Sequence, residues 1–439
     1  MTSQVDETHD PARRSWIESA NGETDFPIQN LPWGIFRPSG GAPRAGVAIG
    51  DRIIDVRAAF EYGWFTGQAA KVAERAGETL NAIMALGAEP RRAFRQQLSA
   101  MLDRAGGDAE RARRDAAAIL FAADECVLEM PAHIGNFTDF YAGIHHALAA
   151  GSLTRPDNPL PRNYKYVPIA YHARASSVCL SGEPVYRPMG QQVEIGGSAV
   201  HFGPTQWLDF ELELGFFIGG SNARGTPIPI AQAADYLFGA VLLNDWSARD
   251  IQFWEADPLG PFLSKNFATT ISPWIMTMEA LAPFRIAAFE RSANDPAPLP
   301  YLYDDEDQQA GGIDIDLAVD IRTAAMRATG LTPHRVTRSS SRHLYWTPAQ
   351  MVAHHTVGGC NLEAGDLIGT GTISGPASDQ LASFVELTRA GTQPIDLPDG
   401  EVRGFLEDGD EIAISGLCRR DGFAPIGFGP CLTEVEPPR

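Results

Sequence analysis

Lysine is scarce in this chain of 439 residues and occurs only at Lys71, Lys165 and Lys265. The other basic residues are arginines, and with 55 acidic against 35 basic residues the formal net charge is −20. This excess of negative charge argues against nucleic acid or an anionic membrane as a partner, although local arginines can still bind a small anion. Lys265 is therefore either a compact ammonium with a specific role or an ordinary surface lysine.

Cysteine and long apolar runs are also rare. The five cysteines are odd in number and show no C-x-x-C spacing, which excludes a disulfide framework or a zinc cluster of that type and predicts reduced thiols. The first 14 residues are polar and lack the apolar core of a secretory signal. Since no apolar run reaches about 18 residues, we expect no membrane span and a cytoplasmic location.

Several familiar catalytic motifs are missing. The chain has no G-x-S-x-G nucleophile elbow and no H-E-x-x-H zinc motif. If the protein is a hydrolase, we therefore expect it to use water activated with the help of a metal rather than a covalent serine.

The segment from Leu208 to Phe217, LDFELELGFF, alternates apolar and acidic residues. On a strand this period of two places Asp209, Glu211 and Glu213 on one face. Three carboxylates on one face repel each other unless water or a cation separates them. The alternative is an ordinary solvent-exposed strand face, but the residues that follow are too apolar for an exposed edge. The segment predicts an oxygen-rich metal site of the kind preferred by Mg²⁺ or Ca²⁺.

A second acidic segment combines Asp139 and Tyr141 with the adjacent His145 and His146. An acidic ligand followed by a histidine can place a metal and a general base in one pocket, because imidazole titrates near neutral pH. The alternative is a loop carboxylate beside a structural histidine.

A third segment, LLNDWSARDIQ, is predicted to run from a buried strand into Asp245 and then into a short polar helix. Arg249 and Gln252 lie three residues apart and so share one helical face, where they can bind a carboxylate or an enolate. The alternative is a helix cap with an ordinary ion pair.

Two weaker signals lie further along the chain. The glycines of GTGTISGP at 369–376, which includes Thr372, allow close approach of the backbone to an anion, or form a plain turn. Glu386 lies in FVEL, which we interpret as an apolar strand. Its carboxylate either orients a histidine or occupies a surface position.

The length favours at least two domains. Residues 1–20 are polar and are predicted to form a loose arm, followed by an N-terminal domain over 21–130 with short β runs, a hairpin at Gly50-Asp51, and two or three helices between 66 and 122. Residues 131–439 read mostly as short strands and form the larger domain. Helices are expected at 231–236 and 347–355, and an exposed excursion at 291–312.

Taken together, these segments resemble the fumarylacetoacetase family, and the resemblance extends over nearly the whole chain. The blocks that carry it are DFPIQNLP at 25–32, GVAIGD at 46–51, YHARASS at 171–177, ELE at 211–213, NDWSARDIQ at 244–252, PLGPFL at 258–263, GTISGP at 371–376, GT at 391–392, PIDL at 394–397 and DGDE at 408–411.

The resemblance implies a mainly β, α+β fold: a small SH3-like β-barrel in the N-terminal domain and a large, mixed β-sandwich roll in the C-terminal catalytic domain, paired as a homodimer. It implies metal ligation by Asp139, Glu211, Glu213 and Asp245, with Lys265 and Thr269 in a region that holds a second cation. It further implies His146 as general base and Glu386 as its orienting carboxylate. Arg249, Gln252 and Lys265 would stabilise negative charge, and the substrate contacts would be Tyr141, Arg155, Tyr171, Gln252 and Thr372.

The activity that the resemblance implies is metal-dependent hydrolysis of a small anionic diketo acid, 4-fumarylacetoacetate, to fumarate and acetoacetate. A related hydrolase, decarboxylase or isomerase acting on shorter keto acids is the nearest alternative. The long N-terminal domain and the histidine–glutamate pair favour fumarylacetoacetase. A non-catalytic β-sandwich binding module, which would need neither metal nor base, is the alternative from another class.

Overall fold

The N-terminal part of the chain forms an antiparallel sheet with helices packed on it. The computed structural model describes residues 4–193 and 197–439. The sheet has the strand order β4-β3-β2-β1-β5. Gly50, with a φ of +55°, makes the turn between β2 and β3, which confirms the predicted hairpin. The strands are β1 (Trp33–Pro38), β2 (Arg44–Ile49), β3 (Arg52–Asp55), β4 (Leu120–Ala122) and β5 (Cys126–Glu129).

Helices fill the sequence between β3 and β4, as predicted. The segment 66–122 contains four of them rather than two or three, because one short turn of helix precedes Gly87. Their apolar faces bury Val72, Ile83, Phe94 and Leu98 in one core with the sheet. The helices are α1 (Val56–Glu61), α2 (Gly67–Glu74), α3 (Asn81–Met84), α4 (Ala88–Leu102) and α5 (Ala109–Ile119).

Residues 4–20 pack against both parts of the molecule. Thr8 and His9 are buried, in a short 3-10 turn. The Arg95 Nε of α4 donates to Thr8 Oγ1 at 2.9 Å, and His9 Nε2 lies 2.8 Å from the carbonyl oxygen of Glu279. The prediction of a loose arm was therefore wrong for these residues, because polar side chains on this segment satisfy buried groups elsewhere.

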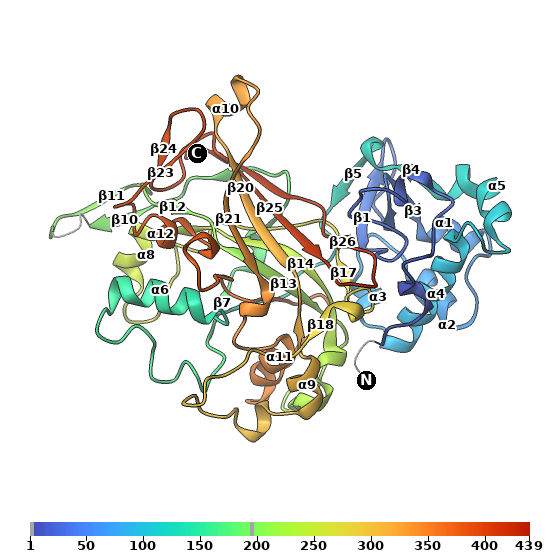
Figure 1. The fold of residues 1–439 in the computed structure, drawn as a ribbon, viewed down its shortest axis with the longest axis horizontal. Helices are drawn as coiled ribbons and strands as arrows, with labels where there is room; N and C mark the ends of the chain where they lie inside the picture. The colour runs from blue at the N-terminus through green and yellow to red at the C-terminus, as the bar shows by residue number, and fades with distance from the viewer. Residues whose placement is uncertain (1–3, 194–196) are drawn as a thin grey trace.

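The C-terminal part is built on two mixed sheets that pack face to face, with strands β13 and β14 of the first against β20, β25 and β27 of the second. Figure 1 shows them at the centre of the molecule, beside the N-terminal sheet. The first has the order β7-β6-β22-β13-β14-β16-β8, with β17 paired to β14. Its strands are β6 (Phe137–Phe140), β7 (Ala170–Ala173), β8 (Val178–Leu180), β13 (Leu212–Ile218), β14 (Leu237–Asp245), β16 (Thr269–Ile271), β17 (Met276–Thr277) and β22 (Leu367–Gly369).

The second sheet has the order β21-β20-β25-β27-β9, with β26 paired to β25. Its strands are β9 (Val185–Tyr186), β20 (Asp316–Arg322), β21 (His334–Ser340), β25 (Glu411–Cys418), β26 (Ile426–Gly427) and β27 (Cys431–Glu436). Short pairs complete the strands: β10 (Met189–Val193) with β11 (Val200–Pro204), β12 (Leu208–Asp209) with β15 (Ser247–Ala248), β18 (Arg285–Ile286) with β19 (Gly312–Ile313), and β23 (Ile395–Asp396) with β24 (Val402–Arg403). The prediction of a mainly β fold with some helices is confirmed.

Short helices connect these strands. Those expected at 231–236 and 347–355 are present, the first continuing into a 3-10 turn. The expected excursion at 291–312 contains a helix and buries Leu302 and Asp307. The helices are α6 (Ile144–Thr154), α7 (Ile230–Ala233), α8 (Arg249–Glu255), α9 (Asp305–Ala310), α10 (Ala324–Ala328), α11 (Pro348–Thr356) and α12 (Phe384–Leu387).

The acidic segment 208–217 forms two strands instead of one. The strand is interrupted at residues 210–211, which lie between β12 and β13. Every residue of the segment is buried. Leu212, Leu214 and Phe216 of β13 face the core between the two sheets, as the alternation predicts, while Phe217 packs against the N-terminal part. Glu213 is therefore a fully buried acid.

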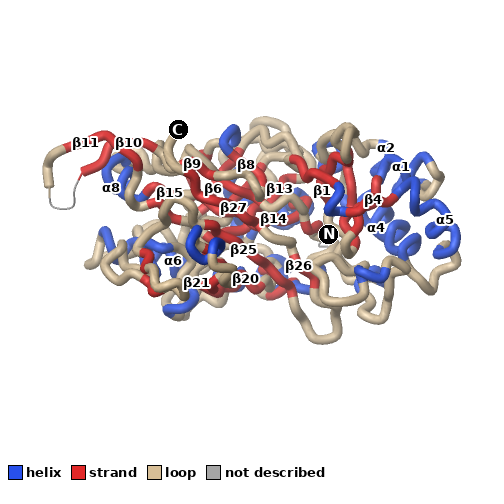
Figure 2. Tube along the Cα trace, turned by 90° about the horizontal axis from the view of Figure 1, so that it is seen from above, coloured by secondary structure: helices blue, strands red, loops and turns tan. Residues whose placement is uncertain are grey.

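No helix among residues 4–193 and 197–439 is long and apolar enough to cross a membrane. All five cysteines are free thiols, in agreement with the sequence. Figure 2 shows the hairpin β10–β11 at the opposite end of the molecule from the N-terminal helices.

Candidate metal centre and active site

Three carboxylates meet at the ends of neighbouring strands of the first sheet. Gly369 of β22 pairs with Asp139 of β6 on one side and with Gly215 of β13 on the other, which brings Asp139 beside Glu213. Asp245 ends the adjacent strand β14. One carboxylate oxygen from each of these three acids lies within 4.8 Å of the other two, and all three acids are buried.

Gly369 is required for this approach. A Cβ atom added at Gly369 would lie 2.2 Å from Oδ1 of Asp139 and 3.3 Å from Oε2 of Glu213. The backbone N–H of Gly371 donates to both carboxylates, at 3.2 Å to Asp139 and 2.9 Å to Glu213. Glycines at 369 and 371 thus let the main chain pass directly beneath the acids.

The electrostatics of this cluster fit a divalent cation. Burial and the neighbouring Asp245 raise the pKa of Asp139 well above its ordinary value, and burial and Asp139 do the same to the pKa of Glu213. Oε1 of Glu213 is buried and has no hydrogen-bond partner among the described residues. Closely spaced acidic oxygens with an unpartnered lone pair match the donor set of Mg²⁺ or Ca²⁺.

Glu211 lies beside this cluster in a different environment. Lys265 Nζ is 2.6 Å from its Oε2, and Arg249 Nη2 is 2.7 Å from its Oε1. Burial alone would raise the pKa of Glu211, but the two cations, with His146, hold it below its ordinary value. Of the four acids that the sequence predicted as ligands, three therefore gather in one cluster, and the fourth is paired with cations at its edge.

Asp245 is held by three donors from other segments. The hydroxyl of Tyr171 donates to Oδ2 at 2.8 Å, and Lys265 Nζ donates to the same oxygen at 3.0 Å. Thr269 Oγ1 donates to Oδ1 at 3.1 Å. Lys265 is buried with a pKa raised by its two carboxylate partners beyond the loss caused by burial, so it remains an ammonium. The surface-lysine alternative is wrong.

His146 and Glu386 form a buried pair next to the acids. His146 Nδ1 lies 2.8 Å from Oε2 of Glu386, and His146 Nε2 lies 3.9 Å from Oε1 of Glu211. Ser374 and Ser383 both donate hydroxyl hydrogen bonds to the Glu386 carboxylate, at 2.9 and 2.6 Å. Burial would raise the pKa of Glu386, but His146 and these hydroxyls lower it, so Glu386 is a carboxylate beside the imidazole.

Glu386 lies in a helix and not in a strand. The segment FVEL forms α12, and Glu386 is buried there. The strand prediction failed because four apolar-rich residues do not distinguish a helical turn from a strand by periodicity.

The predicted substrate contacts differ in how closely the structure ties them to this pair. The Tyr141 ring is edge-on to His146 with centroids 5.5 Å apart, and Gln252 Oε1 accepts from Arg249 Nη1 at 3.0 Å. Thr372 Oγ1 is buried without a partner among the described residues. By contrast, Arg155 follows the end of α6, is exposed, and donates to the carbonyl oxygen of Pro159 at 3.2 Å. Burial raises the pKa of Tyr141, and the positive charge of Arg155 partly opposes that increase.

Two family models together match almost the whole chain. The family model described as "Fumarylacetoacetate (FAA) hydrolase C-terminal" matches residues 136–436, and "Fumarylacetoacetase N-terminal" matches residues 29–131. A fumarylacetoacetase from Arabidopsis thaliana is 43% identical over 430 residues, which cover 97% of this chain and 98% of that protein. The human fumarylacetoacetase is 43% identical over 422 residues, or 94% of this chain and 97% of that protein.

The chain belongs to the fumarylacetoacetase family. Among solved structures, a fumarylacetoacetate hydrolase from Exiguobacterium antarcticum is similar in fold, with a TM-score of 0.50, 18% identity, and coverage of 93% of this chain and 100% of that chain.

Sequence reasoning placed Asp209 on the acidic face of the segment 208–217 but gave it no specific role in the site. Its Oδ1 accepts from the backbone N–H of Phe384 at 2.6 Å, and its Oδ2 accepts from Val385 N–H at 3.0 Å and from Arg249 Nε at 2.8 Å. It thus joins the first turn of α12, which carries Glu386, to the arginine that contacts Glu211. The alternation in residues 208–213 predicted that Asp209 shares a face with Glu211 and Glu213. In the structure Asp209 is the last residue of β12, and its carboxylate contacts α12 and Arg249.

Asp209→Asn tests this link. An amide nitrogen facing donors leaves at least one of them unpaired, so we expect kcat to fall about 10- to 100-fold through misplacement of Glu386 and Arg249. Asp410→Asn is the matched control, because Asp410 is equally buried and accepts from Arg403 Nε at 2.8 Å and Glu407 N–H at 2.9 Å. Both variants should lose thermal stability. Equal loss of turnover in both would contradict a positioning role for Asp209.

Proposed function

We propose that this chain hydrolyses the carbon–carbon bond of 4-fumarylacetoacetate to fumarate and acetoacetate, the last step of tyrosine and phenylalanine degradation. The observation that carries this proposal is the identity of 43% to fumarylacetoacetase over 97% of the chain. The carboxylate cluster next to a buried histidine–glutamate pair supports it, because the reaction needs both charge stabilisation and a base.

The dication in this proposal is Mg²⁺ or Ca²⁺, which Asp139, Glu213 and Asp245 would hold, with Glu211 as a fourth ligand. When bound, such an ion supplies Lewis-acid polarisation of the diketone oxygens. A second cation in the region of Lys265 and Thr269 would need oxygen ligands other than the Lys265 side chain, which is itself a cation.

His146 acts as the general base. Its Nε2 lies 3.9 Å from Oε1 of Glu211 while Nδ1 faces Glu386, so Nε2 takes a proton from water and the Glu386 carboxylate stabilises the imidazolium that forms. The hydroxide oxygen bonds to the carbonyl carbon next to the fumaryl double bond, and the bond from that carbon to the acetoacetate CH₂ breaks with its electron pair moving into the acetoacetate enolate. The enolate carbon then takes up the proton that His146 removed from water, which restores the neutral imidazole.

Arg249, Gln252 and Lys265 stabilise the charge that develops on the leaving enolate. Arg249 and Lys265 are buried and fixed on Glu211, and Arg249 also fixes Gln252. A preorganised donor of this kind contributes about 3 to 4 kcal/mol to lowering the barrier. The substrate itself contacts Tyr141, Tyr171, Thr372, Gln252 and, at an anionic end, Arg155.

We further propose a homodimer in the cytoplasm, with domains at 21–130 and 131–439 and an SH3-like barrel in the first. The dimer is supported by apolar side chains on the projecting hairpin β10–β11 (Figure 2) and next to it on α8. Phe202 is 70% exposed, and Val200, Met189, Phe253 and Trp254 are between 40% and 50% exposed. Exposed apolar groups gathered in this way are typical of surfaces that another protein covers.

Turnover on fumarylacetoacetate, compared with shorter acylpyruvates, tests the activity. With Mg²⁺ present, we expect kcat/KM, measured from the loss of the diketone absorbance, to be at least about tenfold higher for fumarylacetoacetate than for acylpyruvates. The reason is that its additional carboxylate reaches Arg155. A preference for acylpyruvates would assign the chain to the related keto-acid hydrolases. The absence of turnover on either would favour a binding module.

A further inference from the structure

A cavity lies on the face of strand β6 opposite the carboxylate cluster. It has a volume of about 690 Å³ and is bordered by β6, β7, the segment after β7, the end of α11 and the loop at 360–362. In the pairing of β6 with β7, Asp139 lies opposite Tyr171, and Thr138 lies opposite His172. Since successive side chains on a strand point to opposite faces, Thr138 and His172 face this cavity while Asp139 and Tyr171 face the metal centre.

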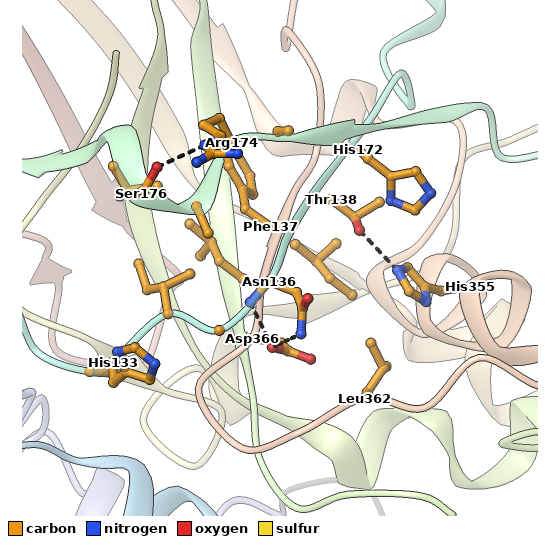
Figure 3. A pocket seen from close by; sticks show the side chains of 18 of the residues that line it. His133, Asn136, Phe137, Thr138, His172, Arg174, Ser176, His355, Leu362 and Asp366 are labelled. Atoms are coloured by element: carbon orange, nitrogen blue, oxygen red, sulfur yellow. Dashed lines mark hydrogen bonds between the residues drawn. The ribbon is translucent and has the colours of Figure 1, made fainter. Parts of the chain in front are cut away.

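The polar side chains around the cavity include one arginine and three histidines (Figure 3). Arg174 is exposed and donates through Nε to Ser176 Oγ at 2.8 Å, which leaves its two terminal nitrogens without a protein partner among the described residues. His172 is likewise exposed and unpartnered there. His355 Nε2 lies 2.9 Å from Thr138 Oγ1, and its Nδ1 is buried without a partner in the described chain.

The one acid in the lining is already satisfied. Asp366 is buried, and its Oδ1 accepts from both the backbone and side-chain N–H groups of Asn136, at 3.0 and 2.9 Å. Its Oδ2 accepts from the N–H of Glu363 at 2.9 Å. In a chain with a net charge of −20, this hollow therefore combines one exposed guanidinium and three imidazoles, those of His133, His172 and His355, with a single acid that is already hydrogen-bonded.

The remaining walls are apolar and include Met130, Ile134 and Leu362. A cavity with apolar walls and a few converging polar groups is the usual form of a small-molecule site. In Figure 3, Arg174 lies on a different side of the cavity from His172 and His355. A ligand with a hydrogen-bond acceptor at each end and an apolar middle would match the arginine side, the histidine side and the apolar walls between them.

We propose that this cavity binds a small organic dicarboxylate, with one carboxylate on Arg174 and Ser176 and the other on His172. A guanidinium binds a carboxylate through two parallel hydrogen bonds, which makes Arg174 the main determinant of affinity. The ligand lies one residue along β6 from a proposed metal ligand, yet outside the metal centre. The proposal does not depend on the reaction assigned above.

Calorimetric titration of the full-length, metal-loaded protein with succinate tests this site. The matched pair is Arg174→Gln and Arg155→Gln, since both arginines are exposed and only the second belongs to the proposed active site. We expect Arg174→Gln to weaken succinate binding at least tenfold, His172→Gln to weaken it less, and Arg155→Gln to leave it unchanged. Turnover and thermal stability of Arg174→Gln should match those of the unmodified protein.

Three outcomes would overturn the proposal: no succinate binding to the unmodified protein, binding lost in Arg155→Gln but kept in Arg174→Gln, or equal affinity for inorganic phosphate and succinate. The last would show a simple anion site without recognition of the carbon chain. A succinate-bound crystal structure with the ligand between Arg174 and His172 would support the proposal directly.

Discussion

Replacing His146 by alanine is expected to lower kcat for fumarylacetoacetate by a factor of about 10² to 10⁴, while the protein still binds its metal. A positioned general base contributes a factor of this size, and no other described histidine has a buried carboxylate partner at 2.8 Å. Stopped-flow absorbance gives kcat, and metal content is measured by mass spectrometry after gel filtration.

The adjacent His145 provides the control. The sequence offered both histidines as candidates, but the His145 ring faces Phe289 and His343, with centroids 6.3 and 5.5 Å away, instead of Glu386. We therefore expect His145→Ala to keep kcat within about threefold of the unmodified protein, since it removes no proton-transfer group. Normal turnover in His146→Ala, or its loss in His145→Ala alone, would refute the assignment of the base.

Replacing Glu213 by glutamine is expected to abolish the stabilisation that Mg²⁺ or Ca²⁺ gives the protein. At a metal concentration 100 times Kd, binding to the native state adds about 2.7 kcal/mol to the free energy of unfolding. The variant removes a negative charge from the centre of the cluster and leaves an amide nitrogen near the cation. Thermal unfolding with and without metal measures the difference, and Glu407→Gln, at a position with a side chain 67% exposed, is the control.

The variant Glu211→Ala tests whether Glu211 is itself a metal ligand or only holds the two cations at the edge of the cluster. If Glu211 completes the ligand set, this variant also loses metal affinity. If it serves only to hold Lys265 and Arg249, its metal-induced shift will equal that of the unmodified protein while kcat falls. The second result would reduce the ligand set to the three acids that already gather.

The metal effect should grow with pH. Burial and mutual repulsion raise the pKa values of Asp139 and Glu213 above their ordinary values of 3.8 and 4.5, so the metal-free folded protein keeps protons that the unfolded chain releases. The metal-free protein therefore loses stability as pH rises above the ordinary values. A cation displaces those protons, so the metal-induced increase in stability is larger at pH 8 than at pH 5. Equal increments at both pH values would contradict a site built on these two acids.

Local patterns in the sequence determined much of this protein. The strand that ends at Asp245, the helix that carries Arg249 and Gln252, and the hairpin at Gly50 follow from short-range periodicity and turn chemistry, and each is present. The residue types of the site were likewise visible, because acids, histidines and glycines within apolar segments conflict with ordinary packing and thereby mark function.

Only the tertiary structure decided how those residues are used. Glu386 meets His146 from 240 positions away along the chain, and Asp209 bonds to Phe384 over 175 positions. No periodicity encodes such pairings. Residues 4–20 are ordered for the same reason, since their partners Arg95 and Glu279 lie far along the chain. The separation of Glu211, beside two cations, from Glu213, among acids, depends on which strands become neighbours. That neighbourhood is set by burial of the whole sheet and not by any local segment.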